Sequence, residues 1–139
     1  MRTTLLLRVA SVTSLLFAAG HTLGGTQEWS PMGETDVLQA MRTHRFDVMG
    51  LSRTYLDFYR GFGYTLTVTL LLQAVLLWQL ASLARTEPRR ASPMIASFVL
   101  ASLASTVIAW AIILPVPAYF AAFLTACLAA ALLTSWRGR

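Results

Sequence analysis

Residues 91–136 read ASPMIASFVLASLASTVIAWAIILPVPAYFAAFLTACLAAALLTSW and contain no formally charged side chain. A helix needs about 20 apolar residues to cross a bilayer, so this run of 46 residues is too long for one span. The Pro-Val-Pro triplet at 115–117 predicts a break, because proline lacks a backbone donor and clashes with the preceding helical turn. The stretch therefore predicts two membrane-spanning helices, at about residues 92–114 and 118–135.

Two further uncharged stretches precede this segment. Nineteen residues separate Arg8 from Glu28, and residues 61–84 form a run of 24. Apolar residues make up 56% of the chain and charged residues 12%, whereas roughly a quarter of a typical soluble domain is charged. We therefore expect an all-α integral membrane protein, a four-helix bundle that forms one transmembrane domain over residues 1–139. Its first two spans are expected at about residues 4–23 and 61–84.

The basic composition does not indicate a nucleic-acid-binding protein. The pI is about 10.4, but the 11 arginines are scattered near the ends of the predicted spans and do not gather on one face. Cys127 is the single cysteine, which excludes a disulfide scaffold, and we expect it to be an inert core residue. No nucleotide-binding glycine pattern and no Cys-x-x-Cys pair is present, so the sequence predicts no cofactor and no metal site.

The arginines are distributed unequally between the two sides of the four-span arrangement. One side holds one acidic residue and seven arginines, namely Arg2, Arg8, Arg85, Arg89, Arg90, Arg137 and Arg139. The other side holds four arginines and five acidic residues. Because cytoplasmic segments are enriched in basic residues, both termini are expected in the cytoplasm and residues 24–60 outside. Residues 2–20 also resemble a cleavable signal peptide, but this charge distribution favours a retained first span.

The connection 24–60 between the first two spans is long and rich in charge. Loops of more than about 12–15 residues are uncommon and often functional, so we expect a structured extracytoplasmic loop. A short helix is predicted from Thr35 or Asp36 to about Met49, because apolar residues recur there at helical spacing. These apolar residues are Val37, Leu38, Met41 and Val48. Ser52 is predicted to cap a second helix, which continues into the second span.

Ionisable side chains are expected to meet at the outer end of the bundle. His21 lies on the last turn of the first span, and an ionisable group within a span is by default a functional-site hypothesis. An interfacial histidine bonded to loop backbone is the alternative. On a helix that begins at Ser52, Asp57 would share one face with Arg53 and Arg60, which would hold its carboxylate ionised. That cluster is either a structural ion-pair network or a carboxylate and a guanidinium held for chemistry.

Further candidate residues accompany these groups. His44 and Asp47 are three residues apart, so they would face each other on one helical turn or share a ligand. Several aromatic residues either pack as an interfacial belt or form apolar walls around a lipophilic ligand. They are Tyr55, Phe58, Tyr59, Phe62 and Tyr64 at the start of the second span, and Trp110 and Tyr119 near the last connection. Together these residues predict a pocket that opens to the outer leaflet.

Three strings resemble those of a family of small bacterial four-span membrane proteins. They are residues 21–24 (HTLG), 43–50 (THRFDVMG) and 55–63 (YLDFYRGFG). The resemblance covers most of the chain and implies a four-helix membrane fold, with no particular activity. More remotely, the layout is similar to that of DoxX-like proteins and emopamil-binding-type sterol isomerases. Eleven arginines without a lysine are typical of a high-GC bacterial genome, so we expect a multi-pass protein of the bacterial cytoplasmic (inner) membrane.

Two functions from different classes fit these residues. In the first, an enzyme isomerises, cyclises or hydrates a lipophilic small molecule, with His21 as acid or base and Asp47 or Asp57 as its partner. Arg53 would then bind an oxyanion or a carboxylate. In the second, the protein is a non-enzymatic lipid- or quinone-binding accessory subunit of a membrane complex. Axial ligation of a b-type haem by His21 and His44 is a third alternative. Membrane lipid and the ligand are the expected partners, nucleic acid is not, and a homo-oligomer stays open.

Overall fold

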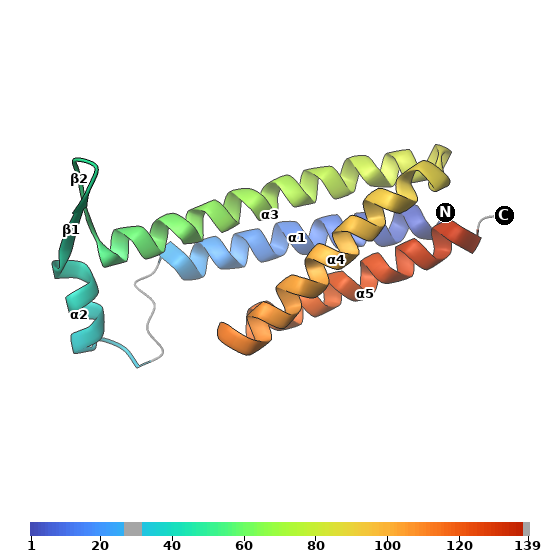
Figure 1. Cartoon of the computed structure of the whole chain (residues 1–139). Helices are drawn as coiled ribbons and strands as arrows, with labels where there is room; N and C mark the ends of the chain where they lie inside the picture. Colours follow the sequence, from blue (N-terminus) through green and yellow to red (C-terminus); the bar gives the residue numbers. More distant parts are fainter. Residues whose placement is uncertain (27–31, 138–139) are drawn as a thin grey trace. The chain divides into compact units, whose positions relative to one another are not determined.

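The computed structural model describes residues 1–26 and 32–137 of the chain. Within these residues it contains five helices and one two-stranded hairpin (Figure 1). In chain order they are α1 (Arg2–Thr26), α2 (Asp36–Thr43), β1 (Arg45–Val48), β2 (Leu51–Thr54), α3 (Tyr55–Thr86), α4 (Pro88–Ile112) and α5 (Pro115–Arg137).

Four of these helices, α1, α3, α4 and α5, are long and apolar enough to span a membrane. This confirms the four long apolar helices expected from the sequence and is consistent with a multi-pass membrane protein. The predicted break is also confirmed, since α4 ends at Ile112 and α5 begins at Pro115. Proline is tolerated at the first helical position, where its missing N–H would have no intrahelical partner. Asp57 and Arg60 lie in the first two turns of α3, ahead of the uncharged stretch 61–84 that is expected to span the membrane.

The chain divides into two compact units. Unit 1 contains Met1–Phe17 and Leu70–Arg139, and unit 2 contains Ala18–Thr69. The core of unit 1 combines apolar side chains from all four long helices. Its four large side chains without appreciable exposure are Leu7, Leu77, Ile95 and Leu128. Cys127 belongs to this core, as the sequence predicts.

Small side chains and hydroxyl groups join the helices of unit 1. Four alanines without exposed surface allow the helix backbones to approach closely. They are Ala10, Ala81, Ala91 and Ala131. The Ser14 hydroxyl donates to the Leu70 carbonyl at 3.0 Å, and the hydroxyls of Ser92 and Ser135 are 2.8 Å apart. Such contacts stabilise helix association in lipid, where burial of apolar surface gives little driving force.

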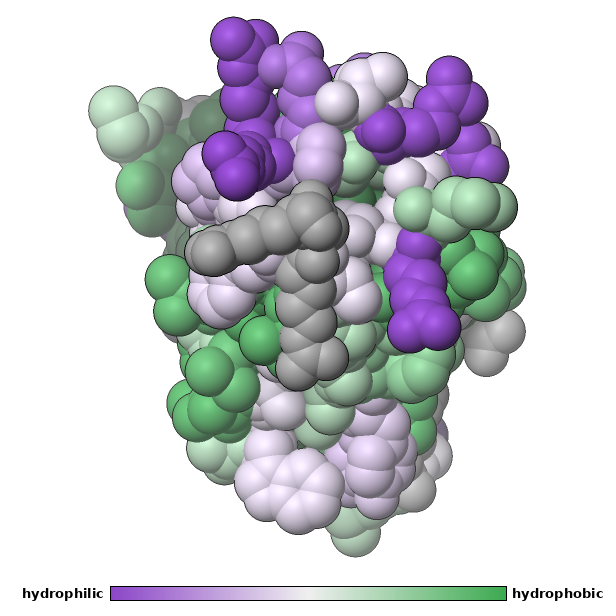
Figure 2. Space-filling view, turned by 90° about the vertical axis from the view of Figure 1, so that its right-hand side faces the viewer, coloured by the Kyte–Doolittle hydropathy of each residue, from purple (hydrophilic) through white to green (hydrophobic). Residues whose placement is uncertain are grey.

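The outward surface of the long helices is apolar. Leu16, Leu100 and Leu133 are 59%, 67% and 50% exposed. Figure 2 looks onto the end of unit 1 that carries the chain termini and shows hydrophobic side chains along the sides of that face. Hydrophilic side chains gather mainly along one edge of the same face. An exposed apolar surface of this extent suits contact with lipid rather than with water.

The predicted helix from Thr35 or Asp36 to Met49 is correct at its start and wrong at its end. The Thr35 hydroxyl accepts a hydrogen bond from the Leu38 amide at 3.2 Å, and α2 begins at Asp36. This is the arrangement of a helix N-cap, which satisfies one of the first backbone donors. The helix stops at Thr43, after which the backbone becomes extended.

Residues 45–54 form a β-hairpin instead of the second half of that helix. The strands β1 and β2 pair antiparallel, in a register that places Arg45 opposite Thr54. Met49 and Gly50 connect them, with φ angles of 52° and 80°. Two consecutive positive φ angles are what a two-residue type I′ turn requires, and this turn matches the natural twist of paired strands.

Candidate functional site

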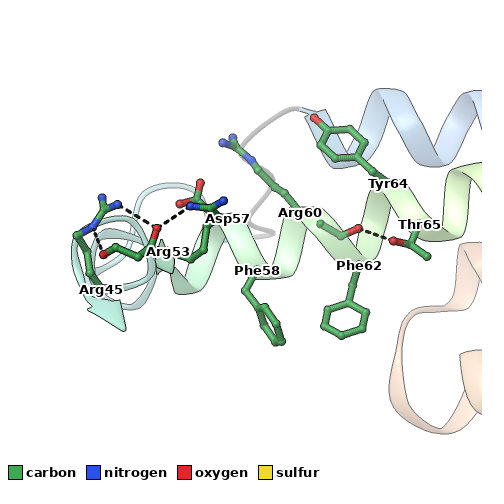
Figure 3. A pocket seen from close by; sticks show the side chains of 10 residues that line it. Arg45, Arg53, Asp57, Phe58, Arg60, Phe62, Tyr64 and Thr65 are labelled. Atoms are coloured by element: carbon green, nitrogen blue, oxygen red, sulfur yellow. Dashed lines mark hydrogen bonds between the residues drawn. The ribbon is translucent and has the colours of Figure 1, made fainter. Parts of the chain in front are cut away.

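An open hollow lies where the hairpin meets the start of α3 (Figure 3). Its volume is about 790 Å³, and its lining comes from β1, β2 and the first three turns of α3, all in unit 2. The lining residues are Arg45, Ser52, Arg53, Asp57, Phe58, Arg60, Gly61, Phe62, Tyr64 and Thr65. Two of the four residues predicted as catalytic, Arg53 and Asp57, are therefore brought together here.

Thr54 and Asp57 fix the junction between β2 and α3. The Thr54 amide donates to the Asp57 carboxylate and the Asp57 amide donates to the Thr54 hydroxyl, both at 3.0 Å. This reciprocal pair is a capping box, which satisfies two backbone N–H groups at the helix start. The hydrogen bonds with Thr54 are the main cause that lowers the pKa of the Asp57 carboxyl, and the charges of Arg45 and Arg53 add to it. The predicted cap at Ser52 is wrong, because Ser52 lies in β2.

Arg45 and Arg53 converge on Ser52. The Nε of Arg45 donates to the Ser52 hydroxyl at 3.1 Å, and its Nη2 donates to the Ser52 carbonyl at 3.4 Å. The Nη1 of Arg53 donates to the same carbonyl oxygen at 2.8 Å. Because Arg53 lies on β2, the predicted helix face shared by Arg53, Asp57 and Arg60 is wrong. Instead, two guanidiniums from opposite strands concentrate positive charge at the hairpin end of the hollow.

Phe58 and Phe62 form the apolar side of the hollow. They are one turn apart on α3, and their ring centroids are 4.9 Å apart in an edge-to-face arrangement. Figure 3 shows these two rings on one side of α3 and the side chains of Arg60 and Tyr64 on the other. Gly61 lies between them in the sequence, and no heavy atom stands within 4 Å of where its side chain would begin. The hollow is therefore open at Gly61, and the rings of Phe58 and Phe62 form its aromatic wall.

His21 also belongs to unit 2 but does not line the hollow. Its Nε2 lies 3.0 Å from the Gly63 carbonyl oxygen. Since a carbonyl oxygen only accepts, Nε2 carries the hydrogen in this bond. The hydroxyls of Thr22 and Thr67, 3.0 Å apart, join the same two helices. These contacts favour the interpretation of His21 as a histidine bonded to backbone, and its role in proton transfer stays a prediction.

His44 and Asp47 do not share a helical turn. The backbone amide and Nδ1 of His44 both donate to the Ala40 carbonyl, at 2.9 Å and 3.0 Å, so that His44 ends α2. Asp47 lies on β1, opposite Ser52. The prediction that His44 and Asp47 face each other on one turn is wrong, because the helix stops before Asp47.

The predicted aromatic ligand contacts fall into both units. Tyr55 lies 5.1 Å from Phe46 between ring centroids, and Tyr59 is 61% exposed. Neither tyrosine lines the hollow. Trp110 and Tyr119 belong to unit 1, where their ring centroids are 6.3 Å apart. A contribution of these four residues to ligand binding stays a prediction.

Four lining residues are absent from the predicted site. Two of them come from the hairpin. Side chains alternate between the two faces of paired strands, and the strand register places these two on the same face. The other two stand four and eight residues after Asp57, a spacing that places them on one face of a helix. The four are Arg45, Ser52, Gly61 and Thr65.

Within residues 1–26 and 32–137, no group of three or more His, Cys, Asp or Glu side chains is placed to hold a metal ion. No family model, curated protein or solved structure matches the chain. The resemblance of the three strings to a family of four-span proteins therefore stays a prediction, and the hollow itself carries the functional conclusion.

Proposed function

We propose that the chain is a multi-pass membrane protein that binds a lipophilic small molecule in the hollow at the start of α3. The observation that carries this proposal is the change of polarity along the hollow. Arg45 and Arg53 lie at its hairpin end, and Phe58 and Phe62 line one side of it farther along α3, where the uncharged stretch 61–84 begins. Arg60 and Tyr64 lie on the other side of the helix. An amphipathic molecule has the same order, a polar head followed by an apolar body.

The dimensions of the hollow support a ligand of this kind. From Asp57 to Thr65 the helix rises about 12 Å, at 1.5 Å per residue. Pockets for drug-sized molecules have volumes of roughly 300–1,000 Å³. The volume of about 790 Å³ lies within that range. Because the hollow is open, one flank of the ligand would keep its contact with the surroundings, which suits a molecule that arrives from the bilayer.

Binding without catalysis is the better supported of the two classes. Asp57, the one carboxylate of the lining, already caps α3, and His21 lies outside the lining with its Nε2 engaged by Gly63. The protein would then be a lipid- or quinone-binding subunit. Acid/base isomerisation, cyclisation or hydration stays the alternative, and the place of Asp57 beside Arg53 favours it. Chemical conversion of the bound molecule by the wild type, lost in Asp57→Asn, would decide for an enzyme.

Removal of the aromatic wall is expected to release the ligand. The double variant Phe58→Ala/Phe62→Ala should retain at most about one fifth of the lipophilic molecule that co-purifies with the wild type, because each ring supplies a large apolar contact. Mass spectrometry of extracts from equal amounts of purified protein measures this content.

Phe123→Ala is the matched control for the aromatic variant. Phe123 on α5 is 53% exposed and Phe58 is 55% exposed, so both rings contact the surroundings to the same extent. The control should keep the wild-type ligand content. Full retention in the double variant, or an equal loss in Phe123→Ala, would contradict binding in the hollow.

We also propose that the protein lies in a bacterial inner membrane with both termini in the cytoplasm and the hairpin outside. The unequal distribution of arginines supports this orientation. With the buried Cys127 replaced by alanine, a cysteine at Met49, which is 98% exposed, should react with a membrane-impermeant thiol reagent in intact cells. A cysteine at Glu87, between α3 and α4, should react only after lysis. The opposite pattern would invert the orientation.

A further inference from the structure

We infer that the ligand of the hollow is a phosphorylated lipid, with its phosphoryl group held between Arg45 and Arg53 and its tail along Phe58 and Phe62. This inference rests on the proposed function and names the chemical class of the ligand. At the hairpin end of the hollow, Arg45 and Arg53 contribute two guanidiniums and Asp57 contributes one carboxylate, so this part of the lining carries a net positive charge. A lining of this charge favours an anionic head over a neutral or cationic one.

The two arginines of the hairpin retain many donors for such an anion. A guanidinium carries five N–H groups in a planar fork. Among the described residues, Arg45 directs two of its nitrogens to Ser52, and Arg53 directs one. Both side chains are exposed, so their other N–H groups are open to a ligand.

The way in which the two guanidiniums meet favours a phosphoryl group. Both donate to the carbonyl oxygen of Ser52, so two like charges are held close together. An anion between them would offset that repulsion. A carboxylate presents two coplanar oxygens, which suit one guanidinium fork. A phosphoryl group presents its oxygens in tetrahedral directions and can therefore bond two forks that come from different strands.

The nearby carboxylate of Asp57 does not take the place of an anion between Arg45 and Arg53. Asp57 accepts a hydrogen bond from the Thr54 amide at 3.0 Å, which commits it to the start of α3. Its charge acts on Arg45 and Arg53, but its side chain forms no ion pair with either one among the described residues. Asp57 therefore offsets at most one of the two positive charges of Arg45 and Arg53, and the other is left for a ligand.

The aromatic side chains Phe58 and Phe62 provide an apolar surface for the lipid tail. Phe58 and Phe62 follow the arginines in the direction of the uncharged stretch 61–84. In a bilayer the order is the same, since lipid phosphates lie outside the hydrocarbon core and the acyl chains lie within it. A lipid could therefore keep its usual depth while its phosphate contacts the hairpin and its chain lies along α3.

Three probes added to the full-length protein in detergent test the inference. Phosphatidic acid has both a phosphate and acyl chains, diacylglycerol of the same chains lacks the phosphate, and inorganic phosphate lacks the chains. Native mass spectrometry measures the occupancy of each. Phosphatidic acid is expected to bind at least about ten-fold more tightly than either of the others, because charge-assisted hydrogen bonds and apolar contact both contribute.

Arg53→Gln is the variant with the smallest structural consequence, because among the described residues the Arg53 side chain hydrogen-bonds only to the carbonyl of the preceding residue. This variant should weaken the binding of phosphatidic acid by about five-fold or more and leave the affinity for diacylglycerol unchanged. Arg53→Lys keeps the positive charge but lacks the planar guanidinium fork, so its affinity for phosphatidic acid should lie between those of Arg53→Gln and the wild type. Arg89→Gln on α4, which removes an exposed arginine from unit 1, should bind like the wild type, and circular dichroism verifies the helical content of each variant.

The outcomes separate the inference from the proposed function. Equal affinity for phosphatidic acid and diacylglycerol would overturn the phosphoryl head and leave lipophile binding intact. Inorganic phosphate binding as tightly as phosphatidic acid would show that the source is the free anion and overturn the lipid tail. Unchanged phosphatidic acid binding in Arg53→Gln, or binding of neither lipid by the wild type, would also overturn the inference. The ligand content of the Phe58→Ala/Phe62→Ala variant decides the proposed function separately.

Discussion

Leu128→Ala is expected to lower the free energy of unfolding by about 2 kcal/mol. Leu128 lies on α5 without exposed surface and belongs to the same core cluster as Leu7 and Leu77. In soluble proteins this truncation costs roughly 2–5 kcal/mol, as the sum of a transfer and a cavity contribution. Lipid is as apolar as the core, so the transfer contribution is small in a membrane protein and the lost packing contacts dominate. The expected cost therefore lies at the low end of that range.

Leu133→Ala is the control for this prediction, because it makes the same change on the same helix at a side chain that is 50% exposed. Its loss of free energy should be well below that of Leu128→Ala. Reversible unfolding in mixed micelles with increasing sodium dodecyl sulfate measures both variants. Equal losses in the two would mean that unit 1 has no packed core at Leu128.

The spanning helices could be predicted because their signal is local. Each depends on one uncharged stretch of sufficient length, and the run 91–136 contains the proline triplet that divides it. The exact helix ends could not be predicted in the same way. Helix α5 begins at Pro115, three residues before the predicted span at 118, because proline is accommodated in the first turn of a helix.

The hairpin could not be predicted from helical spacing, because that spacing was partly accidental. Val48 stands seven residues after Met41, which fits a helix, but it also follows Phe46 by two, which fits a strand. Gly50 favours a turn in both interpretations. The decisive property is the positive φ of Met49, and a methionine gives no signal for it, since Asn or Asp is the usual residue there.

Only part of the candidate site can be predicted from the sequence, because the rest of it depends on the hairpin. Arg53, Asp57 and the aromatic residues at the start of the second span can be predicted to lie near one another, because they are close in the sequence. Their arrangement depends on the hairpin, which moves Arg53 off the helix and brings Arg45 to the same carbonyl. Local spacing cannot show a contact made across a turn. The bond of His21 to Gly63 is a second example, since it joins residues 42 apart in the chain.

Thr54→Ala is expected to destabilise the junction between the hairpin and α3 by about 1 kcal/mol. The Thr54 hydroxyl accepts the hydrogen bond of the Asp57 amide, and alanine leaves that donor without its partner at the helix start. Since β2 and α3 are joined with no residue between them, the loss should also loosen the strand pairing. Hydrogen exchange of the backbone amides in residues 51–58 measures the local opening, which should become about five-fold faster.

The place of the cap in the fold is tested by two further variants. Thr69→Ala makes the same change on α3 at an exposed threonine whose hydroxyl bonds only to the preceding turn, so the exchange at residues 51–58 should stay at the wild-type rate. Asp57→Asn keeps an oxygen that can accept from the Thr54 amide, so it should accelerate exchange less than Thr54→Ala. An unchanged rate in Thr54→Ala would mean that strand pairing alone positions the junction. Faster exchange in that variant, combined with weaker ligand retention, would instead show that the hollow depends on the cap, because Arg53 and Phe58 are held on either side of it.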